Sequence, residues 1–255
     1  MSTGQEFMYK TTAPFLGDSG EDLNVPQPPL VLPCPEGAAI LELPKPGEVD
    51  FPQADLREII EKRKTLRRYS DDFLTKEELS GLLWLTQGIK AVTKRPVTLR
   101  TVPSAGARHA FETYLLVNRV DGLTHGLYRY MPVEHGLLEM DMTERIAERV
   151  THGCYDQSQV RASAVTFLWV VVTDRMTWRY GERGYRYLHL DAGHVCQNLY
   201  LASEAIGCGV CAIAAFDDEE LNRVLDLDGE SMWVIYAASV GKRVNQPVQL
   251  PDLSA

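Results

Sequence analysis

The segment Arg63-Lys64-Thr65-Leu66-Arg67-Arg68-Tyr69 places four cations and a threonine hydroxyl within seven residues. Planar guanidinium groups and short hydroxyl donors bind a phosphate monoester well, and Arg63, Thr65 and Arg67 supply both. Their side chains converge on one side only if the chain leaves a helix here and becomes extended. Taken alone, the segment also suits the basic last turn of a helix, where cations complement the helix dipole.

A helix is predicted immediately before this segment. Asp55 is a good N-cap, and a helix from Asp55 through Arg63 would carry Leu56, Ile59 and Ile60 on one buried face. The candidate phosphate ligands would then follow the end of a helix.

The rest of the chain mixes helices and strands without a regular βαβ alternation. Thr75-Lys76-Glu77-Glu78 is a capping box that begins another helix, and Val120-Asp121-Gly122 is a hairpin signal between two strands. We expect helices at residues 75–87, 143–150, 187–206 and 218–225, and strands at residues 111–118, 126–130, 164–172, 210–215 and 232–240. This order favours an α+β fold over a doubly wound sheet.

The composition indicates one globular domain, with 255 residues, 45% hydrophobic and 24% charged. A net charge of -9 argues against nucleic acid or an anionic membrane as a partner. The longest apolar run, near residues 165–172, has the length of a strand, and residues 1–20 lack the pattern of a secretory signal. Five cysteines, an odd number, argue against a disulfide framework, so we expect a cytoplasmic protein.

Residues 1–52 hold nine of the 14 prolines, which predicts an extended arm because proline fixes φ and removes an amide donor. The apolar run at residues 38–43 indicates that this arm packs on another part of the protein. We therefore divide the chain into a proline-rich extended arm (1–54), a folded domain (55–243) and a C-terminal tail (244–255).

Two further segments have the composition of ligand-binding loops. Pro103-Ser104-Ala105-Gly106 combines small residues with exposed backbone donors, although the same residues could form a plain loop before a strand. Residues 178–187 are dense in arginine and aromatic side chains. They suit a lid loop over a flat ligand and a dimer interface equally well.

Cys208 and Cys211 invite a zinc or thiol-redox interpretation. A structural zinc site usually needs a second cysteine pair, which the chain lacks, and the redox motif normally opens a helix, whereas here a strand follows. His189 and His194 lie about 140° apart around a helix, so they do not share a face. We therefore expect no metal site and two small buried thiols.

Singly these signals are weak, but their order along the chain resembles the nitroreductase superfamily, and within it the SagB-type branch of thiazoline/oxazoline dehydrogenases. The resemblance covers residues 43–242. It is carried by residues 43–46, 63–69, 83–88, 102–109, 126–130, 180–194, 197–201, 207–216 and 239–242. It implies an α+β nitroreductase-like fold, with a central, mostly antiparallel sheet flanked by helices, and an intertwined homodimer that binds FMN at each interface.

The resemblance also implies the site residues. Arg63, Thr65 and Arg67 would hold the FMN phosphate and the polar edge of the flavin, with Arg67 facing the charge that reduction creates. Further cofactor contacts would come from Pro103, Ser104, Ala105 and Gly106 of the second subunit, from Gly207, Cys208, Gly209, Val210, Ala214 and Ala215 along the ring system, and from Lys242 or Arg243 near the phosphate.

Tyr180 and Arg179 are the expected catalytic residues. Relatives that oxidise azolines carry a Lys-Tyr pair where this chain has Arg179-Tyr180. Arginine stays protonated and cannot act as a general base, so Tyr180 is the candidate acid or base.

These inferences predict an FMN-dependent oxidoreductase that transfers a hydride between flavin N5 and a small or peptide-borne substrate, with NAD(P)H or oxygen as a possible redox partner. One alternative is an NAD(P)H-dependent nitro or quinone reductase. Another is a non-catalytic subunit that binds a flavin or a peptide as a scaffold. A thiol-redox or metal protein built on Cys208 and Cys211 is the third.

Overall fold

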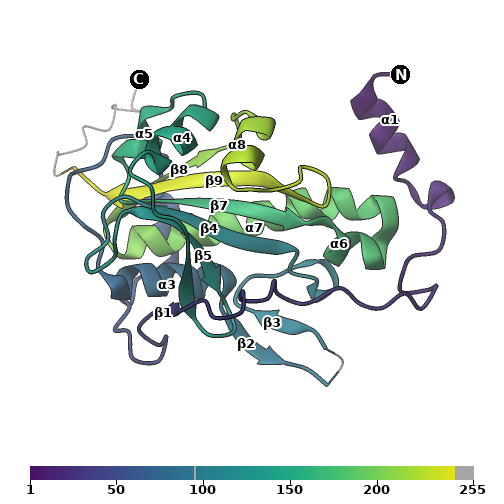
Figure 1. Ribbon diagram of the computed structural model, residues 1–255, viewed down its shortest axis with the longest axis horizontal. Coiled ribbons are helices and arrows are strands. Elements are labelled where there is room, and N and C mark those ends of the chain that lie inside the picture. The colour runs from purple at the N-terminus through teal and green to yellow at the C-terminus, as the bar shows by residue number, and fades with distance from the viewer. Residues whose placement is uncertain (95, 245–255) are drawn as a thin grey trace.

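The computed structural model describes residues 1–94 and 96–244. Its centre is a seven-stranded sheet in the order β1-β6-β5-β4-β7-β9-β8, in which every neighbouring pair runs antiparallel (Figure 1). The strands are β1 (Ile40–Glu42), β4 (Phe111–Val117), β5 (Gly126–Met131), β6 (Gly136–Asp141), β7 (Val165–Val172), β8 (Cys208–Ile213) and β9 (Met232–Lys242). The predicted antiparallel sheet is confirmed.

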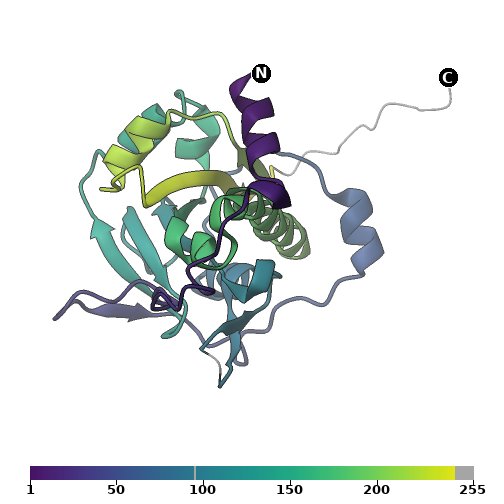
Figure 2. The ribbon, with the colours of Figure 1, turned by 90° about the vertical axis from the view of Figure 1, so that its right-hand side faces the viewer.

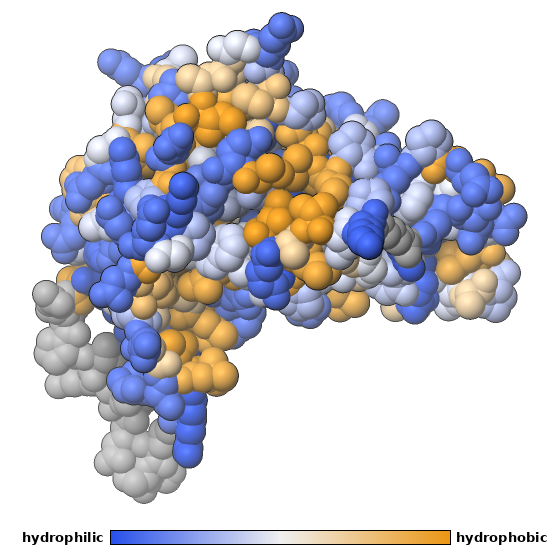
Figure 3. Space-filling view, turned by 90° about the horizontal axis from the view of Figure 1, so that it is seen from below, coloured by the Kyte–Doolittle hydropathy of each residue, from blue (hydrophilic) through white to orange (hydrophobic). Residues whose placement is uncertain are grey.

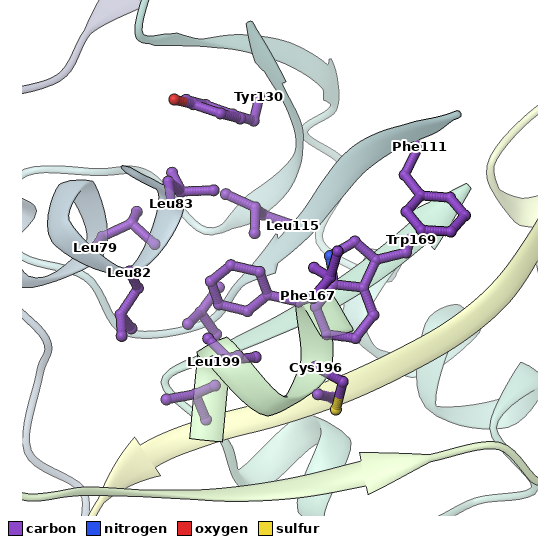
Figure 4. Packing of buried hydrophobic residues seen from close by; sticks show 14 of the residues in the cluster. Leu79, Leu82, Leu83, Phe111, Leu115, Tyr130, Phe167, Trp169, Cys196 and Leu199 are labelled. Atoms are coloured by element: carbon purple, nitrogen blue, oxygen red, sulfur yellow. The ribbon is translucent and has the colours of Figure 1, made fainter. Parts of the chain in front are cut away.

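Helices cover both faces of this sheet (Figure 1). On one face lie α3 (Lys76–Gln87) and α7 (Gly184–Ala205), and on the other lie α4 (Ile146–Gly153), α5 (Ser158–Ala162) and α8 (Asp218–Val224). The side chains of β7 alternate between the two faces of the sheet, and because helices cover both faces, nearly all of them are buried. Phe167 and Trp169 pack between α3 and α7, as Figure 4 shows, whereas Leu168 and Val170 belong to the opposite core.

Most of the predicted elements are present. Asp55 caps α2 (Leu56–Lys62), and Thr75 forms the predicted capping box with Glu78 at the start of α3. The strands at residues 111, 126, 165, 208 and 232 and the helix at residue 218 are also found. Strand β6 and the hairpin of β2 (Ile89–Val92) with β3 (Thr98–Arg100) were not predicted; β2 and β3 have only four and three residues.

The segment at 178–187 is not the loop that the sequence suggested. It consists of the end of α6 (Thr173–Tyr180), the 3-10 turn η3 (Gly181–Arg183) and the start of α7. Gly181, at φ 50°, allows the chain to change direction between the two helices. The aromatic and arginine side chains therefore lie on a helical hairpin, where the backbone is hydrogen-bonded.

The N-terminal arm is only partly extended. Residues 3–10 form a helix, α1 (Thr3–Lys10), because Ser2 and Gln5 make a reciprocal capping box, and η1 (Ala13–Phe15) follows. The predicted packing of residues 38–43 is confirmed, since β1 pairs with β6 at the sheet edge and Leu43 is buried. Of the expected tail, only Val244 lies within the described residues.

Helix α2 stands away from the body of the molecule (Figure 2). None of its residues is buried, and Leu56 and Ile60 are 63% and 53% exposed, so the predicted buried face is wrong within a single chain. Seen from below, hydrophobic side chains gather in patches on the surface (Figure 3). No helix in the described part of the chain is long and apolar enough to span a bilayer.

Candidate functional site

The segment that follows α2 lies along the edge strand β8. Helix α2 ends at Arg63, whose ψ of 125° starts an extended segment. The cations can converge on one side only in such a segment. Thr65 then forms a parallel bridge with Val210, and the amide of Leu66 donates to the carbonyl of Val210 at 2.9 Å. The last-turn interpretation is therefore wrong for residues 64–67.

Two glycines make room for this segment. A Cβ on Gly209 would lie 2.4 Å from Leu66 Cδ1, and a Cβ on Gly241 would lie 2.6 Å from Tyr69 Cγ. Real Cβ atoms do not approach other atoms so closely. The resemblance implies a cofactor contact for Gly209, and the structure gives a separate reason for a glycine there, the close packing of Leu66.

Tyr200 of α7 organises the candidate phosphate ligands. Its phenol oxygen lies 3.1 Å from Thr65 Oγ1 and accepts the amide of Ala212 at 3.0 Å. The guanidinium carbon of Arg63 lies 5.3 Å from the centre of the Tyr200 ring, within the range of a cation–π contact. Tyr200 was not among the predicted site residues, because nothing local in the sequence pairs it with Thr65.

The charges around residues 63–67 favour the binding of an anion. In the described ranges, no carboxylate lies within ion-pair distance of Arg63 or Arg67, and Thr65 and Arg67 are exposed. By contrast, Lys242 is paired with Glu78 and Arg243 with Glu204. The two arginines and the threonine fit a phosphate, whereas the two later cations are already neutralised.

The other residues predicted to line the ring system lie on or beside β8. Gly207 precedes the strand, is exposed and has φ 68°, while Ala214 and Ala215 follow the strand and are exposed. Cys208 and Val210 are buried in the sheet. Of these five, the three outside the strand are accessible to a ligand in a single chain.

The cysteines of the strand are free and buried. Burial raises the pKa of the Cys208 thiol to about 12, and it also raises the pKa of Cys211, which Arg67 partly opposes. Groups of three or more metal-ligating side chains are absent from the described residues. Thiols that stay protonated are poor nucleophiles, so this geometry gives no support to thiol-redox chemistry.

The small-residue loop lies on the other half of α7. Ser104 precedes η2 (Ala105–Ala107), and the amide of Ala105 donates to Asp191 Oδ1 at 3.2 Å. The Ser104 hydroxyl accepts the amide of His109 at 2.9 Å. Burial raises the pKa of the Asp191 carboxyl, which the bonds from Ser104 and Ala105 partly oppose. Asp191 is thus a second residue that holds the site, and its role was not predicted.

The expected catalytic pair packs directly against this loop. Gly106 has φ 56°, and a Cβ there would lie 2.5 Å from the hydroxyl of Tyr180 and 2.9 Å from Arg179 Cδ. The Tyr180 ring also meets the Tyr187 ring edge-on, with 4.9 Å between the ring centroids. The structure therefore brings together Arg179, Tyr180 and Gly106, while Pro103 remains exposed nearby.

Helix α7 connects the two groups. Asp191 holds the loop and Tyr200 holds the arginine segment, and both lie on this one helix. Because an α-helix rises about 1.5 Å per residue, the two positions lie about 14 Å apart along its axis. A single chain therefore presents two separated groups of candidate site residues.

Comparison with known proteins agrees with this geometry. A model of the Nitroreductase family matches residues 60–242, which include both groups and the helix between them. The chain belongs to the nitroreductase family. Its fold is the nitroreductase-like fold, an antiparallel sheet flanked by helices.

Two curated proteins and a solved structure are similar to this chain. A putative nitroreductase of Methanocaldococcus jannaschii is 32% identical over 178 residues, which is 70% of this chain and 87% of that protein. The trifolitoxin-processing protein TfxB of Rhizobium leguminosarum bv. trifolii is 29% identical over 133 residues, 51% of this chain and 36% of TfxB. The crystal structure of a putative nitroreductase from Anabaena variabilis aligns at 30% identity with a TM-score of 0.63, covering 74% of this chain and 38% of that one. The chain thus spans little more than a third of the last two proteins.

Proposed function

We propose that this member of the nitroreductase family is an FMN-dependent oxidoreductase. The observation that carries the proposal is the segment 63–67 along β8, in which Arg63 and Arg67 have no carboxylate partner among the described residues and Thr65 is exposed. The protein has a net charge of -9, so such a cluster runs against its overall field. When bound, FMN would supply hydride transfer at its N5 atom.

The residues of this chain have distinct roles in the proposal. Arg63, Thr65 and Arg67 bind the phosphate and the polar edge of the cofactor by charge-assisted hydrogen bonds. Gly207, Ala214 and Ala215 leave a surface without bulky side chains along which a flat ring system can lie. Tyr180 donates or accepts the proton that accompanies hydride transfer to or from a substrate.

We further propose that a second copy of the chain completes each site. Helix α7 carries an exposed stripe of Leu190, Gly193, His194 and Gln197, and the space beside Gly193 is empty. In the proposed dimer, a two-fold axis crosses this stripe, and loop 103–106 of one chain lies beside residues 63–67 of the other. The dimer would also offer a partner for the exposed Leu56 and Ile60 of α2.

The finer assignment within the family is the SagB-type branch, with a small or peptide-borne substrate and a cytoplasmic location. One support is the Pro103–Gly106 loop, which is hydrogen-bonded to Asp191. The other is the similarity to TfxB, whose name records toxin processing. Nitro or quinone reduction is the second candidate, favoured by the 32% identical relative described as a putative nitroreductase.

The absorption spectrum of the purified protein tests the proposal, followed by identification of the released cofactor. We expect a flavin spectrum and FMN. A colourless protein that does not take up added FMN would instead favour a scaffold subunit. Anaerobic mixing then separates the two enzyme classes, since a reductase is bleached by NADH or NADPH, whereas a dehydrogenase is bleached by its organic substrate.

A further inference from the structure

Part of the N-terminal arm forms a closed turn beside the candidate catalytic pair. In residues 19–25, the amide and hydroxyl of Ser19 both donate to Asp22 Oδ2, at 3.0 and 2.7 Å. The amide of Val25 donates to the carbonyl of Gly20 at 2.8 Å. This segment, which we call the arm turn, is therefore ordered by its own hydrogen bonds.

The arm turn is bound to helix α6 through its main chain. The amide of Glu21 donates to the carbonyl of Trp178 at 2.9 Å, and the indole N–H of Trp178 donates to the carbonyl of Val25 at 2.8 Å. Gly20 lies so close that a Cβ would be 2.9 Å from Trp178 Cδ1. Two hydrogen bonds and a close contact thus fix the turn on the residue that precedes Arg179.

A second contact holds the arm on the next helix. Arg183 donates to the carbonyl of Thr11 at 2.9 Å, and Arg186 Nε donates to the hydroxyl of Thr11 at 2.7 Å. Thr11 is buried as a result, although it lies between α1 and η1. The arm is therefore attached on both sides of the α6–α7 hairpin.

The arm turn places one carboxylate on the catalytic pair. A carboxylate oxygen of Glu21 lies 3.2 Å from Arg179 Nη1, with the two side chains 32% and 28% exposed. The guanidinium carbon of Arg179 in turn lies 5.7 Å from the centre of the Tyr180 ring, and both side chains lie where a Cβ on residue 106 would stand. The contacts run from Glu21 to Arg179, then to Tyr180 and the ligand loop.

We propose that the arm turn is a fixed wall of the active site and that Glu21 is a positioning residue for Arg179 and, through it, for Tyr180. This inference rests on the proposed function of Tyr180. A free arginine side chain samples many rotamers, and a carboxylate held by the main chain restricts it to one. Glu21 also neutralises a guanidinium that would otherwise present an unpaired charge to a substrate.

The opposing interpretation is a half-exposed ion pair that contributes only a little stability, as most surface pairs do. The two interpretations predict different coupling between substitutions of Glu21 and Arg179. If Glu21 acts only through Arg179, its removal has no further effect once Arg179 is gone.

The test compares Glu21→Gln, Arg179→Gln and the double variant in the full chain, with Asp18→Asn as the control. Asp18 is an exposed arm carboxylate just before the turn, so its substitution removes the same charge without touching Arg179. The first readout is hydrogen exchange of residues 19–25 and 176–187 in the FMN-free protein. For Glu21→Gln we expect faster hydrogen exchange in both segments. The double variant should exchange no faster than the faster of the two single variants. Asp18→Asn should exchange at the wild-type rate.

The second readout is the rate at which menadione reoxidises the dithionite-reduced flavin. We expect Glu21→Gln to be about tenfold slower at equal FMN content, as after loss of one charged hydrogen bond, and the double variant to be no slower than Arg179→Gln alone. Unchanged exchange at residues 176–187 in Glu21→Gln, or rate losses that multiply in the double variant, would overturn the inference. A wild-type protein that takes up no FMN refutes the proposed function instead, while the exchange measurement still decides whether Glu21 holds the hairpin.

Discussion

The hydroxyl of Thr65 lies 3.1 Å from the phenol oxygen of Tyr200, although 135 residues separate them in the sequence. The same phenol oxygen accepts the amide of Ala212, a residue of β8. One side chain of α7 therefore joins the arginine segment to the edge strand. The position of Thr65, and with it the candidate phosphate site, depends on a residue that would not itself touch the phosphate.

Tyr200→Phe should therefore weaken FMN binding without abolishing it. The variant keeps the ring under Arg63 but loses the hydrogen bonds to Thr65 and Ala212, each worth about 0.5–1.5 kcal/mol. Because only the bond to Thr65 bears directly on the phosphate site, we expect the dissociation constant of FMN, measured by flavin fluorescence titration, to rise about threefold to tenfold. Affinity equal to that of the wild type would show that Thr65 holds its place without Tyr200.

Arg63→Ala and Arg67→Ala should each have a larger effect. Each removes hydrogen bonds from a charged donor, worth about 1.5–3 kcal/mol, which corresponds to a loss of about tenfold to a hundredfold in FMN affinity. Arg57→Ala is the matched control, because Arg57 is an exposed cation of α2 paired with Glu61. If both site variants purify fully loaded with flavin, the phosphate assignment is wrong.

Gly209→Ala should displace the arginine segment through Leu66. The new Cβ would lie 2.4 Å from Leu66 Cδ1, and overpacking of this kind costs about 1–3 kcal/mol. We expect a lower melting temperature and lower FMN affinity, measured by calorimetry and titration. Adding Leu66→Ala should recover part of the FMN affinity, since it removes the atom that clashes. Should the double variant bind FMN no better than Gly209→Ala, Gly209 has a role other than making room for Leu66.

His109 predicts a specific acid sensitivity. Burial and the nearby Arg100 and Arg108 lower the pKa of His109 to about 3, from an ordinary value of 6.5. Between these values the unfolded chain binds the proton and the folded protein does not, so stability falls as the pH falls below about 6.5. At pH 4.5 the loss from this group is about 2–3 kcal/mol relative to pH 7.

His109→Asn is the variant that isolates this effect. His109 has φ 44°, a conformation that asparagine tolerates better than most residues. The measurement is the free energy of unfolding in urea at pH 7 and pH 4.5. The difference between the two pH values should be smaller in His109→Asn by about 2–3 kcal/mol, and an equal difference in both proteins would show that His109 is protonated in the folded state.

The thiols offer a chemical test of the buried strand. Cys34 is half-buried, whereas Cys154, Cys196, Cys208 and Cys211 are buried. We expect an aromatic disulfide reagent to react quickly with one thiol per native chain, and with none in Cys34→Ser. A second fast thiol that disappears in Cys208→Ser or Cys211→Ser would revive the thiol-redox interpretation.

Local signals in the sequence were enough to predict much of the fold. The capping groups at Asp55 and Thr75 and the apolar run of β7 each depend on neighbouring residues only, and the structure confirms them. The predicted buried face of α2 was wrong within a single chain. An apolar stripe indicates that a helix face is covered, but it does not identify the chain that covers it. The predicted helix at 187–206 is present as most of α7, but the preceding residues 178–186 were expected to form a loop, because arginine and aromatic residues follow no simple apolar period there.

The site residues stay a prediction, and the contacts that hold them in place were not predicted from the sequence. The sequence indicated Arg63, Thr65 and Arg67 by their chemistry. The residues that hold them and the loop, Tyr200 and Asp191, contribute through contacts made across long sequence separations. The same is true of Glu21 and Arg179, which are 158 residues apart. A single sequence gives no local sign of such pairs.

Helix α7 fixes the distance between the two groups of site residues, because Asp191 and Tyr200 both lie on it. Inserting one residue between Asp191 and Tyr200 would advance the later group by about 1.5 Å and turn it by about 100° around the axis. Loops elsewhere in the chain can therefore grow or shrink during evolution, while this interval must keep both its spacing and its phase. In the proposed homodimer, one such insertion would misalign both proposed active sites at once.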